Sequence, residues 1–261
     1  MEKGVRPLFD MKAIYLFLLI TAGCMTAGFN HAANLPESSL INKQKTVDSL
    51  KKAIEEYQQV LSIDPENIEA LCSIAHAYIT IIEIKTHALI VEKDEYKPIL
   101  KDLGSIAVEY AKRAYTLDPR NPDAITAYLK AYGYYSSSMG IVTAVLKGAA
   151  GLYKKLAREL IAVDDTYRDA CGYLCLGRLY YSAPWPVGSK KKACDAFIMA
   201  CKKSNQAVFP HYWLAKTYQA LTDEKYVKEF EIVLSLKPSA YEAHFIDACI
   251  EEAKKQLDNP Q

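Results

Sequence analysis

The chain has 261 residues and carries 32 Lys and Arg against 31 Asp and Glu, a formal net charge of +1. This balance argues against a protein that binds nucleic acid by bulk electrostatics, because no surplus of cations is present to neutralise phosphates. Hydrophobic residues make up 51% and charged residues 24% of the chain, which is typical of a folded protein rather than a disordered one. The 11 Gly and 11 Pro are too few for the many turns of an all-β sandwich or barrel.

The N-terminal residues predict a secretion signal. Lys12 precedes an apolar run over residues 13–22, and a basic start followed by about ten apolar residues is typical of a signal peptide. We therefore assign residues 1–23 to a signal peptide, with Met11 as an alternative start of the chain. An uncleaved membrane anchor is the competing interpretation. Extending the run to Phe29 gives 17 residues, which is near the lower limit for crossing a bilayer.

Small residues lead into the first cysteine of the chain. The segment Thr21-Ala22-Gly23-Cys24 resembles the bacterial lipobox, and the resemblance implies that Cys24 is acylated and becomes the mature N-terminus. Residues 24–44 are mostly polar and have no sustained helical period, so they predict a tether between the lipid and the folded domain. The expected location is the bacterial cell envelope, with the protein lipid-anchored to a membrane and facing the periplasm.

The other cysteines are predicted to be buried thiols that act as small apolar residues. Their spacings are not typical of a disulfide framework, and the chain has no CxxC pair or HxxxH partner of the kind that binds zinc. We therefore expect no metal and no cofactor, and a metal site at Cys171 and Cys175 is a remote alternative. The cysteines in question are Cys72, Cys171, Cys175, Cys194, Cys201 and Cys249.

Two helical patterns alternate within residues 45–258, which we assign to one repeat domain. The first pattern places apolar residues at offsets of four and three, on one face of a helix that ends near a turn signal. Its copies are Ala53/Tyr57/Val60 before Pro65, Ala107/Ala111/Ala114 before Pro119, Ala193/Phe197/Ala200 before Asn205, and Tyr226/Phe230/Val233 before Pro238. The second pattern has spacings of three, one and three, which also form a single stripe. Its copies are Leu71/Ile74/Ala75/Tyr78, Ile125/Tyr128/Leu129/Tyr132, Tyr173/Leu176/Gly177/Tyr180 and His211/Leu214/Ala215/Tyr218.

This alternation resembles the tetratricopeptide repeat (TPR), a helical hairpin of about 34 residues, over about residues 46–250. The resemblance implies an all-α fold, a superhelical array of antiparallel helix pairs. Small residues at the helix crossings let two backbones approach, and the repeated Tyr side chains are interpreted as packing residues that fill the adjacent grooves. Because one hairpin cannot bury its apolar face alone, stacking of neighbouring hairpins supplies the core.

Two insertions interrupt the regular repeat length. The first lies within residues 81–104 and is expected to lengthen both helices around it, in the first two repeats. The second lies within residues 133–151 and is apolar and rich in small residues, but it is too short to cross a membrane. A buried helix is the favoured interpretation of the second insertion. A wall of an apolar cavity and a contact between subunits are the alternatives.

Lengthened, irregular repeats in a secreted lipoprotein resemble the T-component family of tripartite ATP-independent periplasmic (TRAP) transporters. The local likeness runs from Leu152-Tyr153 to Asp165 and continues through Ala183-Pro184 and Gly188-Ser189 to Lys192-Ala193, with Ser189 where the family has Asp. The resemblance implies a periplasmic solute-binding protein as partner, an apolar cavity and a homo-oligomer. It also implies that the chain is a non-catalytic binding or docking component of a solute transport system.

A basic or titratable residue stands two positions before the Tyr that ends each copy of the second pattern. Two positions along a helix correspond to a rotation of about 200°, so these side chains are expected to face away from the Tyr and line the concave surface. Such a ladder suits a carboxylate-bearing peptide, an acidic partner helix or an anionic solute, whereas a solvated helix face is the simpler interpretation. The predicted ladder comprises His76, Lys130, Arg178 and Lys216, with Tyr134, Tyr181 and Tyr212 beside it.

No motif predicts an enzyme. The chain lacks a Gly-rich phosphate loop, a nucleophile elbow and metal-ligand spacing, and His87 and His244 have no catalytic residues near them in sequence. Trp185, between two prolines, is expected to pack back over neighbouring helices, although an exposed Trp could anchor a partner. The alternative function is a scaffold for envelope or outer-membrane assembly, which binds a client peptide in its concave groove.

Overall fold

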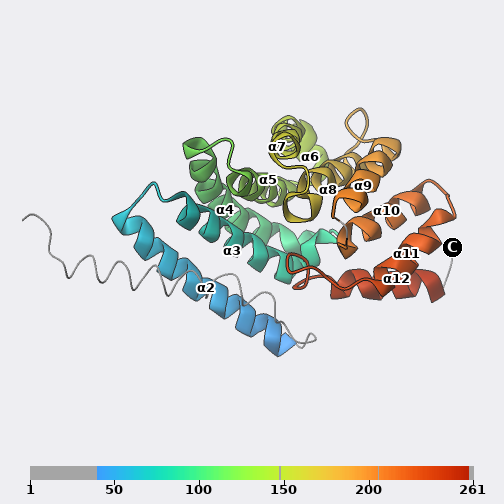
Figure 1. Cartoon of the computed structure of the whole chain (residues 1–261), viewed down its shortest axis with the longest axis horizontal. Helices are drawn as coiled ribbons and strands as arrows, with labels where there is room; N and C mark the ends of the chain where they lie inside the picture. The colour runs from blue at the N-terminus through green and yellow to red at the C-terminus, as the bar shows by residue number, and fades with distance from the viewer. Residues whose placement is uncertain (1–39, 147, 205, 259–261) are drawn as a thin grey trace, which may run out of the picture.

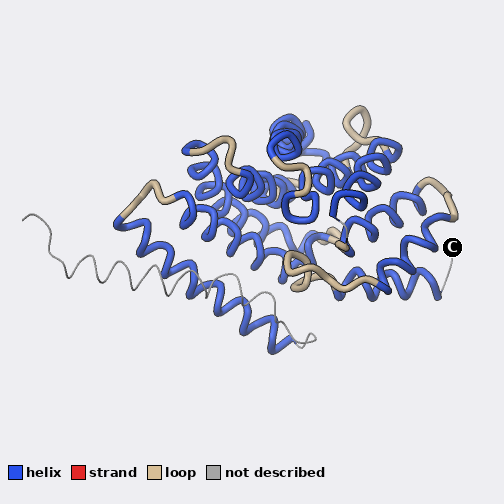
Figure 2. Tube along the Cα trace, in the orientation of Figure 1, coloured by secondary structure: helices blue, strands red, loops and turns tan. Residues whose placement is uncertain are grey.

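The computed structural model describes residues 40–146, 148–204 and 206–258, and within these ranges the chain forms helices joined by turns, without a strand (Figures 1 and 2). The α-helices are α2 (Leu40–Ile63), α3 (Ile68–Thr86), α4 (Lys97–Leu117), α5 (Pro122–Ser137), α6 (Ile141–Leu146), α7 (Ala149–Val163), α8 (Tyr167–Ser182), α9 (Lys190–Ser204), α10 (Val208–Ala220), α11 (Lys225–Ser235) and α12 (Asp247–Asp258). The predicted all-α array of antiparallel helix pairs is confirmed. The predicted signal peptide and Cys24 lie outside the described residues, and α2 includes residues 40–44 of the predicted tether.

Side-chain caps and prolines set the boundaries of the repeated helices. Asn67 caps α3 by accepting a hydrogen bond from the backbone N–H of Ala70 at 2.9 Å, and Asn121 caps α5 in the same way. Pro65 and Pro119 lie in the short turns before these caps, so each proline follows one helix without starting the next. The Asp-Pro signal of the sequence therefore marks the turn between α2 and α3 and the turn between α4 and α5.

The first insertion lengthens the helices on both sides of it, as predicted. Helix α3 has 19 residues and α4 has 21, compared with 16 in both α5 and α8. Two short 3-10 helices, η1 (His87–Leu89) and η2 (Asp94–Tyr96), take up the remaining residues between α3 and α4.

Small residues at the helix crossings allow the close packing that the repeat pattern predicts. Gly177 of α8 lies directly against the ring of Phe197 in α9, and a Cβ at this position would overlap the ring. Ala75 and Ala107 are fully buried where α3 meets α4. The Tyr side chains that end the second pattern pack at the edges of these clusters, in agreement with their interpretation as structural residues.

Residues 236–246, here called the closing segment, connect α11 to α12 and lie beside α3, far away in sequence (Figure 1). His244 in this segment contacts Glu83 of α3 at 2.8 Å, and the neighbouring Asp247 forms an ion pair with Lys43 of α2 at 3.4 Å. Glu242 accepts hydrogen bonds from the first backbone N–H groups of α10, which fixes the segment to that helix end. The first and last parts of the array are therefore joined across its concave side.

The second insertion is not the single buried helix that its composition favours. It forms the end of α5, the short helix α6 and the start of α7, with left-handed turns at Gly140 and Gly148 between them. Left-handed backbone is readily adopted by glycine, which has no Cβ. Ala144 and Ala149 are buried, whereas Leu146 is exposed. The insertion thus folds back at two glycines, a change of direction that its apolar composition does not reveal.

Trp185 does not pack over neighbouring helices: its side chain is 88% exposed, in the turn between α8 and α9. The flanking prolines and the tight approach of Gly188 to the backbone of Ala183 hold this turn away from the helices. Each cysteine that the structure describes is a free thiol, and most are buried. None of the described helices is both long enough and apolar enough to cross a membrane.

Candidate ligand-binding cavity

A cavity of about 930 Å³ lies on the concave side of the array, between α2, α3, α5, α8, the second insertion and the closing segment. Its volume falls within the range of small-molecule binding sites in proteins, about 300–1,000 Å³. Much of the wall is apolar or made of small residues, including Ala77, Ile79, Leu89, Ala149, Leu174 and Phe245. The second insertion contributes residues from Gly133 to Ala150, so its alternative interpretation as a cavity wall agrees with the structure.

Glu83 is a buried carboxylate in the cavity wall, with its side chain 3% exposed. One oxygen, Oε1, contacts the Lys130 ammonium at 2.7 Å and accepts a hydrogen bond from the Tyr134 hydroxyl at 2.9 Å, and Oε2 lies 2.8 Å from Nε2 of His244. Burial alone would raise the pKa of Glu83, but the cation of Lys130 and the hydrogen bond from His244 outweigh it and hold this pKa well below the usual carboxyl range. Glu83 therefore stays ionised inside the protein.

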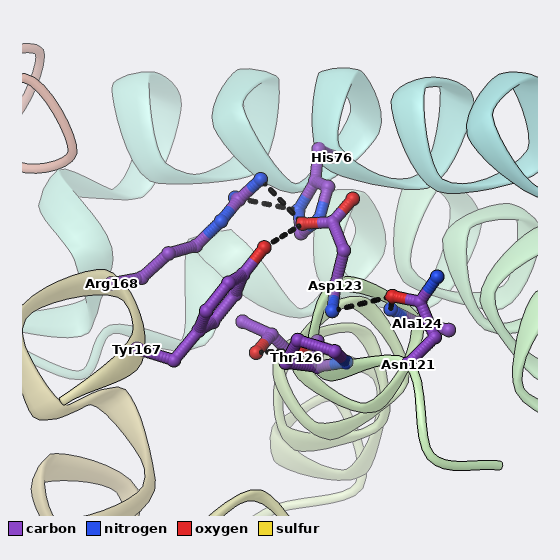
Figure 3. A network of polar contacts seen from close by, with 8 residues as sticks. His76, Asn121, Asp123, Ala124, Thr126, Tyr167 and Arg168 are labelled. Atoms are coloured by element: carbon purple, nitrogen blue, oxygen red, sulfur yellow. Dashed lines mark hydrogen bonds and ion pairs between the residues drawn. The ribbon is translucent and has the colours of Figure 1, made fainter. Parts of the chain in front are cut away.

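A second cluster joins α3, α5 and the start of α8 (Figure 3). Asp123 Oδ1 accepts hydrogen bonds from the Arg168 guanidinium at 2.7 Å and the Tyr167 hydroxyl at 2.8 Å, and lies 3.1 Å from His76 Nε2. Arg168 also approaches Nδ1 of His76 at 3.2 Å. Because guanidinium can only donate and carboxylate can only accept, the network assigns His76 as neutral, with its hydrogen on Nε2. Burial and the Arg168 charge lower the pKa of His76 to about 4.

Arg178 of α8 lines the same cavity. Its Nη2 donates to the carbonyl oxygen of Ala88 at 3.1 Å, and its guanidinium lies over the rings of Phe209 and Trp213, 5.7 and 5.1 Å from their centres. Both rings come from α10, so Arg178 connects the insertion after α3 to the following repeat. Unlike Lys130 and Arg168, it has no ion pair with a carboxylate of the described residues.

The structure brings part of the predicted ladder together and separates the rest. His76, Lys130, Arg178 and Tyr134 line the cavity. Lys216 pairs instead with Glu252 of α12 at 3.5 Å, outside the cavity wall. Tyr181 lies under the ammonium of Lys190, and Tyr212 is buried among aromatic side chains, so neither of these two lines the cavity. Whether the cavity-lining members bind a ligand stays a prediction.

Several cavity residues have no signal in the repeat pattern. Glu83 belongs to an apolar run within the first insertion, and His244 lies in the closing segment, 161 positions away. Arg168 follows Tyr167 at a place where the repeat pattern has a proline, and its backbone is left-handed, with φ of 45°. Each becomes recognisable only through its long-range partner. Among the described residues, no group of three or more His, Cys, Asp or Glu side chains is placed to hold a metal ion.

Comparison with known proteins supports the fold. A family model described as TPR repeat matches residues 49–80. The structure of TTC0263, a thermophilic TPR protein of Thermus thermophilus, is similar over 80% of this chain and 99% of that one, with 15% identity and a TM-score of 0.54. MamA gives 19% identity and a TM-score of 0.47 over 84% and 91% of the two chains. YrrB, described as a TPR protein with an unusual peptide-binding site, gives 14% identity and a TM-score of 0.44 over 90% and 97%. No curated protein matches by sequence.

The family match over residues 49–80 and the likeness to the Thermus structure, taken with the helix pairs, define the fold of the described residues: it is an all-α, TPR-like array. The match of the family model is confined to the first helix pair, where the turn at Asp64-Pro65 and the pair Ala75 and Tyr78 follow the repeat pattern most closely. The lengthened helices and the second insertion separate the later pairs from that regular pattern.

Proposed function

We propose that the protein is a lipid-anchored, non-catalytic component of a solute transport system in the bacterial cell envelope, and that it holds a small ligand in its cavity while docking on a protein partner. The observation that carries the proposal is the cavity of about 930 Å³ behind the closing segment, with apolar walls and a few convergent polar groups. The resemblance to TRAP T-components supports a periplasmic solute-binding protein as the partner.

A small ligand fits this cavity better than a client peptide does. The closing segment crosses the concave side, where an extended peptide would have to lie. In addition, Lys130 and Arg168 are already engaged by Glu83 and Asp123, so these two cations are not free for peptide carboxylates. We therefore favour solute binding over peptide capture in the groove.

Filling the cavity is expected to abolish ligand binding. Ala150 lines the cavity at the start of α7, and Ala150→Trp would place a large ring inside it. We expect the wild-type protein to release a bound small molecule on denaturation, as measured by mass spectrometry of the extracted ligand. The Ala150→Trp protein is expected to release less than a tenth as much.

The matched control is Ala220→Trp, which adds the same ring at an exposed position at the end of α10, outside the cavity wall. This variant should release as much ligand as the wild type. Equal release from the Ala150→Trp protein would contradict the proposed site. A wild-type protein that releases nothing and takes up no compound from a cell extract would contradict the function itself.

The lipid anchor is tested at Cys24. We expect cells that express the full chain to incorporate radiolabelled palmitate into it, and Cys24→Ala to remove the label, because the sulfur of Cys24 carries the lipid. Cys72→Ala is the control, since Cys72 is buried in the helical domain. Label that persists in the Cys24→Ala protein would rule out this anchor.

A further inference from the structure

We propose that Cys171 and Cys175 form a binding site for a soft, thiophilic metal ion, and that the ion is monovalent copper held between the two sulfur atoms. The inference goes beyond the proposed function, because it requires neither an organic solute nor a docking partner. It follows from the distance between the two thiols, their position in the cavity wall and the number of metal-binding side chains that the described residues place beside them.

The two thiols face each other along one side of α8. Cys171 and Cys175 are four positions apart, so their side chains lie on the same face of the helix. Sγ of Cys171 lies 3.8 Å from Sγ of Cys175. The two residues are buried, with exposed fractions of 5% and 6%, but both line the cavity, through which a small ion can reach them. The pair is therefore a preformed set of two sulfur donors inside the protein.

The spacing on the helix favours a bridging ion over a disulfide. A disulfide needs Cβ atoms about 3.5–4.5 Å apart, whereas side chains four positions apart on a helix have Cβ atoms about 5–6 Å apart. Forming the S–S bond would therefore distort α8. A metal ion adds two bonds of about 2.3 Å each, which span about 4.6 Å in a straight line. The observed 3.8 Å between the sulfurs fits such a bridge with a bent S–metal–S angle.

The number of ligands selects the metal. Structural zinc takes four protein ligands and catalytic zinc takes three, but no group of three or more His, Cys, Asp or Glu side chains is placed to hold an ion among the described residues. Cu(I) is a soft cation that prefers thiolates, and two of them suffice to hold it. On binding, two S–H bonds break, two Cu–S bonds form and two protons pass to water. The product is a bis-thiolate complex with one negative charge, and no atom changes its oxidation state.

The surroundings of Cys175 favour the thiolate, which is the form that binds metals. The hydrogen bond from Cys171 lowers the pKa of Cys175 to about 7 against the effect of burial, and the Tyr153 hydroxyl and the charges of Arg178 and Lys130 act in the same direction. The same two cations would offset the negative charge of the copper complex. The site thus combines two sulfur donors with a positive environment.

The test is an anaerobic titration of the full chain with Cu(I) in competition with bicinchoninate, a chelator whose Cu(I) complex is coloured. We expect the wild-type protein to withdraw one Cu(I) per chain from the chelator. Cys171→Ala and Cys175→Ala should each lower the affinity for Cu(I) at least about a hundredfold, because the ion loses one of two linked donors.

Cys249→Ala is the matched control, since it also removes a buried thiol, but one that does not line the cavity. It should keep the wild-type affinity. If a cavity variant shows no cooperative thermal transition, X-ray absorption at the copper edge of the wild-type complex replaces it. We expect that spectrum to show two sulfur neighbours and no nitrogen or oxygen neighbour.

Several results would overturn the site. They are a wild-type protein that leaves Cu(I) with the chelator, an unchanged affinity in both cavity variants, and a copper ion surrounded by nitrogen. A disulfide within the tryptic peptide 169–178, which holds Cys171 and Cys175 and no other cysteine, would overturn the preference for a metal bridge if it forms when the chain is exposed to glutathione disulfide. None of these results bears on the ligand release that Ala150→Trp tests, so the two proposals can fail independently.

Discussion

Replacing Glu83 with alanine is expected to lower the free energy of unfolding by about 3–5 kcal/mol, the usual cost of removing one partner from a buried ion pair. The side chain is 3% exposed and contacts Lys130, Tyr134 and His244. Without the carboxylate, the Lys130 ammonium would remain in the cavity wall with no counterion. The measurement is urea unfolding followed by far-UV circular dichroism.

Two further variants show whether the lost charge is the cause. Glu56→Ala removes an exposed carboxylate whose partner, Lys52, is also on the surface, and it should change stability by less than about 0.5 kcal/mol. Combining Glu83→Leu with Lys130→Met removes both buried charges and should recover most of the lost stability. A loss below about 1 kcal/mol in the Glu83→Ala protein would contradict a buried, charge-paired Glu83.

The position of Glu83 also connects stability to the shape of the cavity. Its partners come from α5 and from the closing segment, so one carboxylate joins three parts of the chain. The contact with His244 spans 161 positions in sequence. Losing the Glu83 carboxylate would remove this contact between the closing segment and α3, while Glu242 would still hold the segment to the start of α10. Glu83 therefore joins two parts of the cavity wall, α3 and the closing segment, and contributes part of the charge of that wall.

The sequence predicts what depends on local geometry. The repeated apolar stripes identify the helix pairs because the helical period is the same wherever it occurs. The same arithmetic places His76, Lys130 and Arg178 on the inner side, since each stands two positions before a packing Tyr. Gly177 and Ala75 are likewise recognisable as crossing residues, because close approach of two helices needs a small side chain.

The pairing of charges is not local, and the repeat pattern does not predict it. From its position in the helix, Lys130 could face solvent, a ligand or Glu83. Which of these it contacts depends on where the first insertion places Glu83, and helical periodicity carries no information on the distance between two repeats. The closing segment shows the same limit, because no sequence pattern relates residues 236–246 to α3. The expectation that Trp185 packs over neighbouring helices is wrong, because its side chain is exposed. The direction of the backbone in its turn decides this exposure, and the type of residue does not predict that direction.

Acidification should destabilise the protein through His76, between about pH 6.5 and pH 4. The pKa of His76 is lowered from 6.5 to about 4 by burial and by the Arg168 charge. In this window the unfolded chain binds a proton that the folded protein excludes, so stability falls as the pH decreases. Protonation would also place an N–H on Nδ1, facing the donor groups of Arg168.

A shift of this size corresponds to roughly 3 kcal/mol, at about 1.4 kcal/mol for each pKa unit. We expect the free energy of unfolding of the wild type to fall by about that much more than that of His76→Gln between pH 6.5 and pH 4, because glutamine does not titrate. Urea unfolding at a series of pH values measures the difference. If the free energy of unfolding changes with pH by the same amount in both proteins, the pKa of His76 does not differ between the folded and the unfolded chain.

The position of the titration can be observed directly. The ring protons of His76, identified by their absence from the spectrum of the His76→Gln protein, should titrate near pH 4 by NMR. Arg168→Gln removes the neighbouring cation and one donor to Nδ1, so it should raise the pKa of His76. If the pKa of His76 is unchanged in the Arg168→Gln protein, the Arg168 charge does not lower it. Burial alone would then have to explain the neutral imidazole beside Asp123.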